Sequence, residues 1–144
     1  MSARLARGHD GRFGALLITP LSERDTTIEV FGVELVVACI DDARPHPHVT
    51  TFVRAPALGR RQWSVDDLDA ITRCAMPVLR AGRPVAVHCR NGVSRSVTAA
   101  AAILVRLGSH SPADALAACR GHRPPSPTAV GSYWRWARAQ GERS

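Results

Sequence analysis

The sequence predicts a single α/β domain in which a central, mostly parallel sheet of about four to five strands is flanked by helices. The 144 residues suit one domain with its own core. Segments with strand character alternate with segments of helical periodicity, which is typical of a parallel sheet covered by helices. Residues 35–40 and 85–87 are continuous apolar runs rich in Val, as expected for strands buried on both faces. A tight loop joins the second run to a helix, at the strand end where α/β folds place their ligands.

The first half of the chain predicts an N-terminal segment, three strands and one helix. Residues 1–12 are rich in Arg and Gly, and we expect them to fray or to form an edge. In order, the elements that follow are a strand at 13–19 stopped by Pro20, a helix at 21–31 capped by Ser22 or Thr27 and ended by Gly32, a strand at 35–40, and a strand at 49–53 closed by Pro56.

The second half predicts four helices around the central strand. They are, in order, a helix from Ser64 with Asp66 and Asp67 in its first turn and Gly82 at its end, a buried helix at 97–107, a helix at 113–119 with Ser111 as N-cap and Pro112 as its first residue, and a last helix at 129–139. These elements define one domain at 13–140, followed by a C-terminal tail at 141–144.

The chemistry of the chain is concentrated in residues 88–96, which read His-Cys-Arg-Asn-Gly-Val-Ser-Arg-Ser. A strand-loop-helix turn points backbone N–H groups inward and adds the positive end of the helix dipole, a nest that suits a phosphoryl dianion. In that field we expect Cys89 to be a thiolate near neutral pH and therefore a nucleophile. Arg95 offers a planar fork of donors to two phosphoryl oxygens, and Ser96 can donate a hydrogen bond to the sulfur when it leaves. The combination predicts a covalent phosphoryl-transfer site.

The other loop residues are expected to surround the phosphoryl group. Gly92 can take the positive φ that a tight loop needs. The pattern His-Cys-x-x-Gly-x-x-Arg-Ser fixes five positions, and its chance occurrence in a chain of this length is on the order of one in ten thousand. The predicted substrate-binding set is Arg90, Asn91, Gly92, Val93, Ser94 and Arg95.

Residues 88–96 resemble the signature of the cysteine-dependent protein phosphatases, and the ending Ser94-Arg95-Ser96 is most similar to the dual-specificity branch. Residues 123–131 and 31–37 are similar to two further segments of that branch. The resemblance implies a catalytic domain that needs no metal or cofactor and hydrolyses phosphotyrosine, with phosphoserine and phosphothreonine as further substrates, through a phosphocysteine intermediate. The implied partner is a phosphorylated protein.

The sequence departs from this family at the general acid. The family carries an Asp in the loop after the strand that corresponds to 49–53, whereas residues 55–63 here contain no carboxylate. Asp66 and Asp67 follow that loop, and Asp42 ends a neighbouring strand, as does Asp41. These residues are the candidate substitutes. Weakened acid catalysis would favour substrates with good leaving groups, such as phenolic phosphates.

Two other functions remain open. An RNA 5′-triphosphatase of the same superfamily can dispense with the Asp because a diphosphate leaves easily, and a basic chain is compatible with RNA. A pseudophosphatase would bind phosphoproteins without turnover, although the intact Cys89 and Arg95 argue for an enzyme. Extra basic residues, which a phosphoinositide phosphatase usually places in the loop, are limited to Arg90.

The composition of the chain indicates its charge, its use of cysteine and its cellular compartment. All 19 basic residues are Arg and the net charge is +7, which suits anionic partners. The four cysteines include no C-x-x-C pair, so a metal site and a disulfide scaffold are both poorly supported. Cys39 ends the strand expected beside the active one, either as a buried structural residue or as a disulfide partner for Cys89. The chain has no apolar run of membrane-spanning length, and a catalytic thiolate requires a reducing compartment, which predicts a cytoplasmic protein.

Overall fold

The computed structural model describes residues 4–5, 13–40, 44–47, 49, 51–54, 63–91 and 93–143. Its strands form one five-stranded sheet in the order β1-β2-β5-β3-β4, in which β1 is antiparallel to β2 and the other pairs are parallel. The strands are β1 (Arg4–Leu5), β2 (Leu16–Pro20), β3 (Leu35–Ala38), β4 (Thr51–Arg54) and β5 (Val85–Cys89). The predicted α/β architecture is therefore confirmed, and Arg4–Leu5 form the expected edge.

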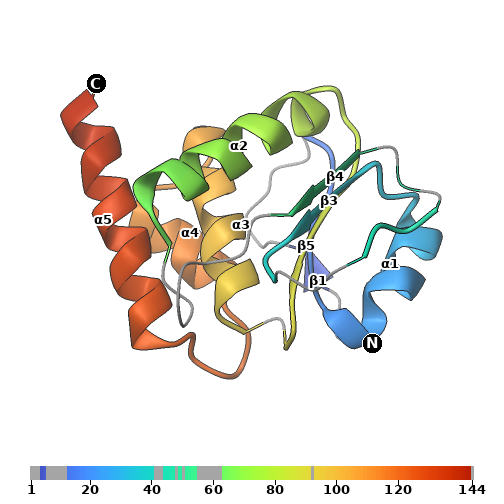
Figure 1. Cartoon of the computed structure of the whole chain (residues 1–144). Coiled ribbons are helices and arrows are strands. Elements are labelled where there is room, and N and C mark those ends of the chain that lie inside the picture. Colours follow the sequence, from blue (N-terminus) through green and yellow to red (C-terminus); the bar gives the residue numbers. More distant parts are fainter. Residues whose placement is uncertain are drawn as a thin grey trace.

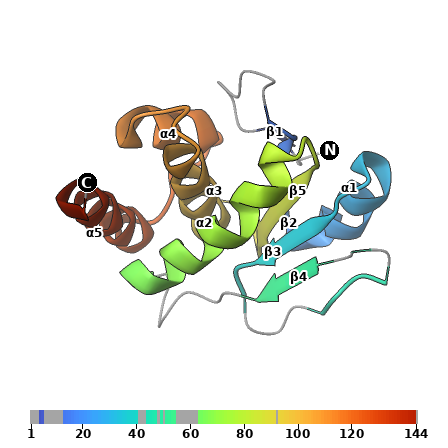
Figure 2. The same ribbon diagram turned by 90° about the horizontal axis from the view of Figure 1, so that it is seen from above.

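The helices cover the sheet on both faces. Figures 1 and 2 show α1 on one face and α2 and α3 on the other, with α4 and α5 packed on the outer side of α3. The helical elements are the short 3₁₀ helix η1 (Leu21–Glu23), α1 (Arg24–Phe31), α2 (Val65–Arg80), α3 (Arg95–Arg106), α4 (Pro112–Cys119) and α5 (Pro127–Arg143). The larger core lies between the sheet and α2, α3, α4 and α5, and a smaller core lies under α1.

The central strand β5 is buried along its whole length, as the apolar run predicts. It lies between β2 and β3, with Pro20 opposite Cys89 on one side and Ala38 opposite His88 on the other. Parallel pairing brings the carboxyl ends of all three strands to the same edge of the sheet. Cys89, the last residue of β5, therefore lies at the middle of that edge.

The strand predicted at 13–19 corresponds to β2, which begins only at Leu16. Gly14 packs so closely against the backbone of Arg83 that a Cβ atom there would lie 2.0 Å from the carbonyl oxygen. The Gly14 N–H bonds to the carbonyl of Leu79 instead of a strand. The chain joins the sheet only from Leu16 onward, after Gly14 has passed close to the backbone of Arg83.

The helix starts test the predicted caps. The Ser64 and Ser111 hydroxyls accept hydrogen bonds from the N–H groups of Asp67 and Asp114, at 3.0 and 3.2 Å, so both predicted N-caps are confirmed. The prediction of Ser22 or Thr27 as the first cap is wrong. The chain first forms η1 after Pro20, and Thr27 lies inside α1 with its hydroxyl bonded to the Glu23 carbonyl at 2.8 Å. Gly32 ends α1 with a φ of 62°, as predicted.

The last helix is longer at both ends than the predicted 129–139. It begins at Pro127 and continues to Arg143, into the range proposed as a tail. Asp69 of α2 holds this extension, because its carboxylate accepts hydrogen bonds from Trp136 Nε1 at 2.8 Å and Gln140 Nε2 at 3.0 Å. Arg106 pairs with Asp69 at 3.6 Å and donates to the Gln140 amide oxygen at 2.9 Å. A buried carboxylate thus joins three helices.

Candidate active site

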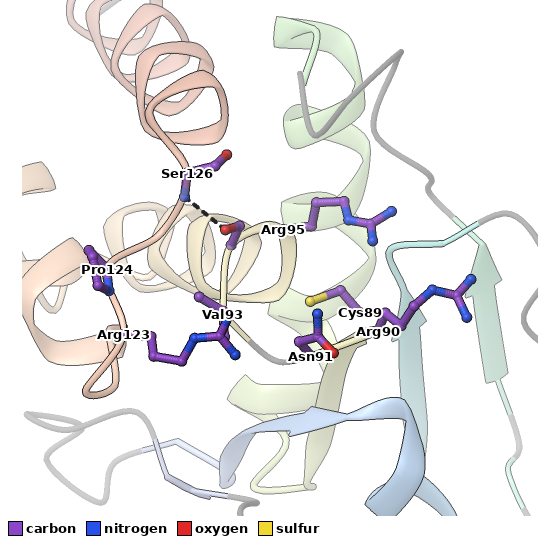
Figure 3. A pocket seen from close by; sticks show the side chains of 9 residues that line it. Cys89, Arg90, Asn91, Val93, Arg95, Arg123, Pro124 and Ser126 are labelled. Carbon is purple, nitrogen blue, oxygen red and sulfur yellow. Dashed lines mark hydrogen bonds between the residues drawn. The ribbon is translucent and has the colours of Figure 1, made fainter.

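A cavity of about 330 Å³ opens at the carboxyl end of β5, where the chain passes into α3. Five of the six predicted substrate-binding residues line it, and the sixth, Gly92, lies outside the described residues. The lining consists of Cys89, Arg90, Asn91, Val93, Ser94, Arg95, Arg123, Pro124 and Ser126 (Figure 3). Residues that are adjacent in the sequence and a distant segment therefore form one site.

Cys89 lies almost fully buried at the floor of this cavity, with 3% of its surface exposed. Its Sγ atom is 3.2 Å from the Oγ of Ser96, which lies in the first turn of α3. Ser96 is fully buried and does not line the cavity, so it contacts Cys89 from behind. The predicted hydroxyl–sulfur pair is present, with the thiol facing the open side.

In the covalent mechanism expected from the sequence, replacing Ser96 by Ala should slow the second chemical step more than the first, because the hydroxyl would stabilise the sulfur that leaves as a thiolate. A hydrogen bond to a charged group predicts a loss of about 10- to 100-fold in hydrolysis of the intermediate. Rapid-quench kinetics with an aryl phosphate would then show a burst of phenol followed by slow turnover. The control is Ser109→Ala, whose hydroxyl bonds to the Leu104 carbonyl at the other end of α3. Equal steady-state rates in both variants, without a burst, would contradict the role.

The start of α3 is left open to an anion. The Ser94 hydroxyl does not cap its own helix. It accepts a hydrogen bond at 2.8 Å from the N–H of Ser126, which precedes α5. The first-turn N–H groups of α3 thus lack a side-chain cap from Ser94 and carry the positive end of the helix dipole. This end of α3 borders the cavity through Ser94 and Arg95.

Arg123 and Ser126 are site residues that were not singled out from the sequence. They belong to the segment before α5, which the family resemblance includes without assigning it to the site. The Ser126–Ser94 hydrogen bond fastens this segment to the loop after β5 (Figure 3). Arg123 therefore adds a third cationic side chain to the cavity lining, besides Arg90 and Arg95.

The structure does not bring the candidate acids Asp66 and Asp67 to the cavity. Both lie in the first turn of α2, where the Asp67 N–H donates to Ser64, and neither side chain lines the cavity. Their position is that of carboxylates at a helix N-terminus. Asp42, like Asp41 and residues 55–62, lies outside the described residues. Within the part of the chain that is described, the cavity lining contains no carboxylate.

Cys39 lies directly beside Cys89. It follows Ala38, the partner of His88 in the sheet, and its N–H bonds to the His88 carbonyl at 2.8 Å. Both cysteines are buried, and neither forms a disulfide within the described residues. Burial raises the pKa of Cys39 well above its ordinary value, and the neighbouring Cys89 raises it further. Cys39 therefore keeps its proton at neutral pH, in contrast to the nucleophile expected of Cys89.

His88 precedes Cys89 in the central strand β5. Its side chain is fully buried. Burial lowers the pKa of His88 to about 4, and the positive charge of Arg24 acts in the same direction. The ring is consequently neutral beside Cys89 at physiological pH.

This neutral histidine makes stability depend on pH. The pKa of His88 is 6.5 in the unfolded chain and about 4 in the folded chain, so the unfolded chain takes up the proton first as the pH falls. The stability that depends on a neutral His88 is therefore complete above pH 6.5 and is lost as the pH falls from 6.5 to about 4. The loss amounts to about 3 kcal/mol of unfolding free energy. Urea unfolding between pH 7 and pH 4 should show this slope in the wild type and in exposed His122→Gln, and lack it in His88→Gln. A slope that survives in His88→Gln would assign it to other groups.

Among the described residues, no group of three or more His, Cys, Asp or Glu side chains is arranged to hold a metal ion. Within the same residues, no helix combines the length and the apolar character needed to cross a membrane.

Comparison with known proteins identifies the fold. No family model matches the sequence, and no curated protein matches it significantly in sequence. Human DUSP28 superposes with a TM-score of 0.77 at 22% identity, over 99% of both chains. Tk-PTP in its active form gives 0.68 at 26% identity, over 99% of this chain and 98% of its own. PTPMT1, solved in complex with PI(5)P, gives 0.75 at 18% identity, over 89% and 93%. The chain thus has the fold of the dual-specificity and protein tyrosine phosphatases, in agreement with the resemblance carried by residues 88–96.

Proposed function

We propose that the protein is a phosphatase that hydrolyses phosphotyrosine in proteins through a phosphocysteine intermediate. The observation that carries this proposal is the Cys89–Ser96 pair, 3.2 Å apart, at the floor of a cavity bordered by the start of α3 and by Arg95. A buried nucleophile, a helix N-terminus and a planar cation in one cavity are the components that phosphoryl transfer requires.

In the first step the Cys89 thiolate attacks phosphorus in line, an S–P bond forms, and the ester oxygen leaves with the bonding electron pair. Arg95 and the backbone N–H groups of the loop bind the three equatorial oxygens, where negative charge is spread in the transition state. In the second step water attacks phosphorus and releases inorganic phosphate. The sulfur leaves as a thiolate, stabilised by the hydroxyl of Ser96.

The preference for phosphotyrosine follows from the leaving group. The described part of the lining contains no carboxylate, and residues 55–63 contain none in sequence, so we infer that acid catalysis of the departing ester oxygen is weak. A phenolate is far less basic than the alkoxide of serine or threonine. General acid catalysis is worth about 10²- to 10⁴-fold, and its absence penalises alkyl phosphates most. We therefore infer activity on phosphotyrosine well above that on phosphoserine and phosphothreonine, in the reducing cytoplasm where a thiolate survives.

A second candidate is an RNA 5′-triphosphatase. The same lining favours it, because three arginines and no carboxylate among the described residues suit a polyphosphate whose diphosphate leaves readily. The two candidate functions differ in the leaving group, which is a phenolate for phosphotyrosine and a diphosphate for the RNA 5′-triphosphate.

The test compares four substrates with the wild type and Cys89→Ser: an aryl phosphate, a phosphotyrosine peptide, the matched phosphothreonine peptide and a triphosphate-ended RNA. We expect Cys89-dependent turnover of the first two, at least about 100-fold above the phosphothreonine peptide. Phosphothreonine rates within tenfold of phosphotyrosine would reveal a general acid. Release of the RNA γ-phosphate far above the peptide rates would assign the triphosphatase instead. Tight phosphopeptide binding without any turnover would leave a binding protein.

A further inference from the structure

Trp63, which directly precedes the N-cap Ser64 of α2, is a buried residue that contacts two other helices. Its backbone N–H donates to the Ser132 hydroxyl of α5 at 3.0 Å. Its indole Nε1 donates to the Thr98 hydroxyl of α3 at 2.8 Å. The three helices α2, α3 and α5 pack against one another (Figures 1 and 2). A single tryptophan therefore joins the start of α2 to both of its neighbours.

The hydroxyl that Trp63 contacts supports the first turn of α3. Thr98 donates its hydroxyl proton to the carbonyls of Ser94 and Arg95, at 2.9 and 3.1 Å. Because an indole N–H can only donate, Trp63 occupies the acceptor side of the hydroxyl and directs its proton toward these carbonyls. Within the described residues, the Arg95 side chain makes no hydrogen bond or ion pair. Its position therefore depends on the backbone turn that Thr98 holds.

The same hydrogen bonds act on the backbone donors at the start of α3. The carbonyl of Ser94 shares a peptide group with the N–H of Arg95, and the carbonyl of Arg95 shares one with the N–H of Ser96. A hydrogen bond donated to a carbonyl polarises the peptide group and strengthens its N–H as a donor by about 10–30%. Both N–H groups belong to the first turn of α3, which borders the cavity and lacks a side-chain cap. The indole thus supports the donors that are available to an anion.

Building on the function proposed above, we propose that Trp63 is a positioning residue for phosphoryl transfer. It holds the first turn of α3 so that the Arg95 fork and the first N–H donors match the equatorial oxygens of the transition state. Trp63 does not line the cavity, so it acts through Thr98 and not by contact with the substrate. Since those oxygens carry the most charge in the transition state, loss of this support lowers kcat and leaves KM nearly unchanged.

Trp136 offers a matched comparison with a tryptophan whose role is structural. It is also fully buried, and its Nε1 donates a hydrogen bond of the same length, 2.8 Å, to Asp69. That bond joins α5 to α2 and does not involve the first turn of α3. Trp63→Phe and Trp136→Phe each remove one indole N–H and leave a gap in the core, so both should lower the Tm. Only Trp63→Phe is expected to impair the chemistry.

The experiment measures kcat and KM for an aryl phosphate at a temperature well below the Tm of each variant. Trp63→Phe is expected to lower kcat about 3- to 10-fold, the effect of one hydrogen bond, with KM within about twofold of wild type. Trp136→Phe should change kcat by less than about twofold. Thr98→Val should lower kcat at least as much as Trp63→Phe, whereas Thr98→Ser keeps the hydroxyl and should retain activity. The double variant should lose little more than Thr98→Val, because both substitutions interrupt the same contact.

Anion binding separates this inference from the proposed function. Vanadate mimics the five-coordinate transition state and inorganic phosphate does not, and the dissociation constants of both are measured without turnover. Trp63→Phe should weaken vanadate binding about 3- to 10-fold and phosphate binding less than twofold. This pattern in a chain that turns over no substrate would keep the positioning role and refute the phosphatase.

Several outcomes would overturn the positioning role. They are an unchanged kcat in Trp63→Phe when the wild type is active, equal losses of kcat in Trp63→Phe and Trp136→Phe, and a wild type that binds neither anion. If Trp63→Phe does not fold, the comparison of Thr98→Val with Thr98→Ser decides, and equal kcat values in these two variants would overturn the role as well.

Discussion

Replacing Cys89 by Ser is expected to lower kcat for an aryl phosphate by at least about 10⁴-fold, because it removes the nucleophile while leaving the rest of the cavity in place. A serine hydroxyl stays protonated at neutral pH, and no carboxylate in the described lining can take its proton. The substitution exchanges one small buried side chain for another, so Ser96 and the cavity should keep their positions. Steady-state release of phenol is the measurement.

The same variant separates chemistry from binding. Cys89→Ser should retain affinity for a phosphotyrosine peptide, because Arg95 and the start of α3 remain. The control is Cys39→Ser, which changes the buried cysteine directly after β3, whose N–H bonds to the His88 carbonyl, and leaves Cys89 in place. Residual activity in Cys89→Ser within about 100-fold of wild type would contradict a covalent mechanism. Loss of activity in both variants, with a lowered Tm, would instead indicate damage to the strand edge.

Much of the fold and the centre of the site followed from local sequence. Residues 88–96 are contiguous, so the strand end, the nucleophile and the first turn of the next helix are set by one short pattern. Ser64 and Ser111 were recognised as caps because capping depends on residues three positions apart. Val-rich runs identified the central strands for a similar reason, since burial on both faces requires an unbroken apolar segment.

The rest depended on contacts between distant segments. Ser126 and Ser94 are 32 residues apart, and nothing in either local sequence indicates that one donates to the other. Asp69 resembles any polar residue of an amphipathic helix, yet it accepts from a tryptophan 67 positions later. The lowered pKa of His88 is likewise a property of its buried surroundings. Local patterns therefore predicted Cys89 as the nucleophile, but they did not predict that Arg123 joins the cavity lining, because that depends on tertiary structure.

Replacing Arg95 by Lys is expected to lower kcat/KM for a phosphotyrosine peptide by about 10²- to 10³-fold, although the charge is kept. The reason is geometric. Thr98 fixes the first turn of α3 by donating to the carbonyl of Arg95 at 3.1 Å, and Trp63 Nε1 in turn donates to the Thr98 hydroxyl at 2.8 Å. A planar fork on this rigid support can meet two phosphoryl oxygens at once, whereas an ammonium group presents a single centre.

The matched control is Arg90→Lys, because Arg90 lines the same cavity but extends outward from Cys89 (Figure 3). Its loss should stay below about tenfold, as for one exposed contact to an anion. If both substitutions cost the same, positive charge rather than the planar fork would account for phosphate binding. If Arg95→Lys lowers kcat and raises KM little, the fork acts mainly in the transition state, where the equatorial oxygens carry the most charge. A rise in KM alone would assign Arg95 to substrate binding and require another source for transition-state stabilisation.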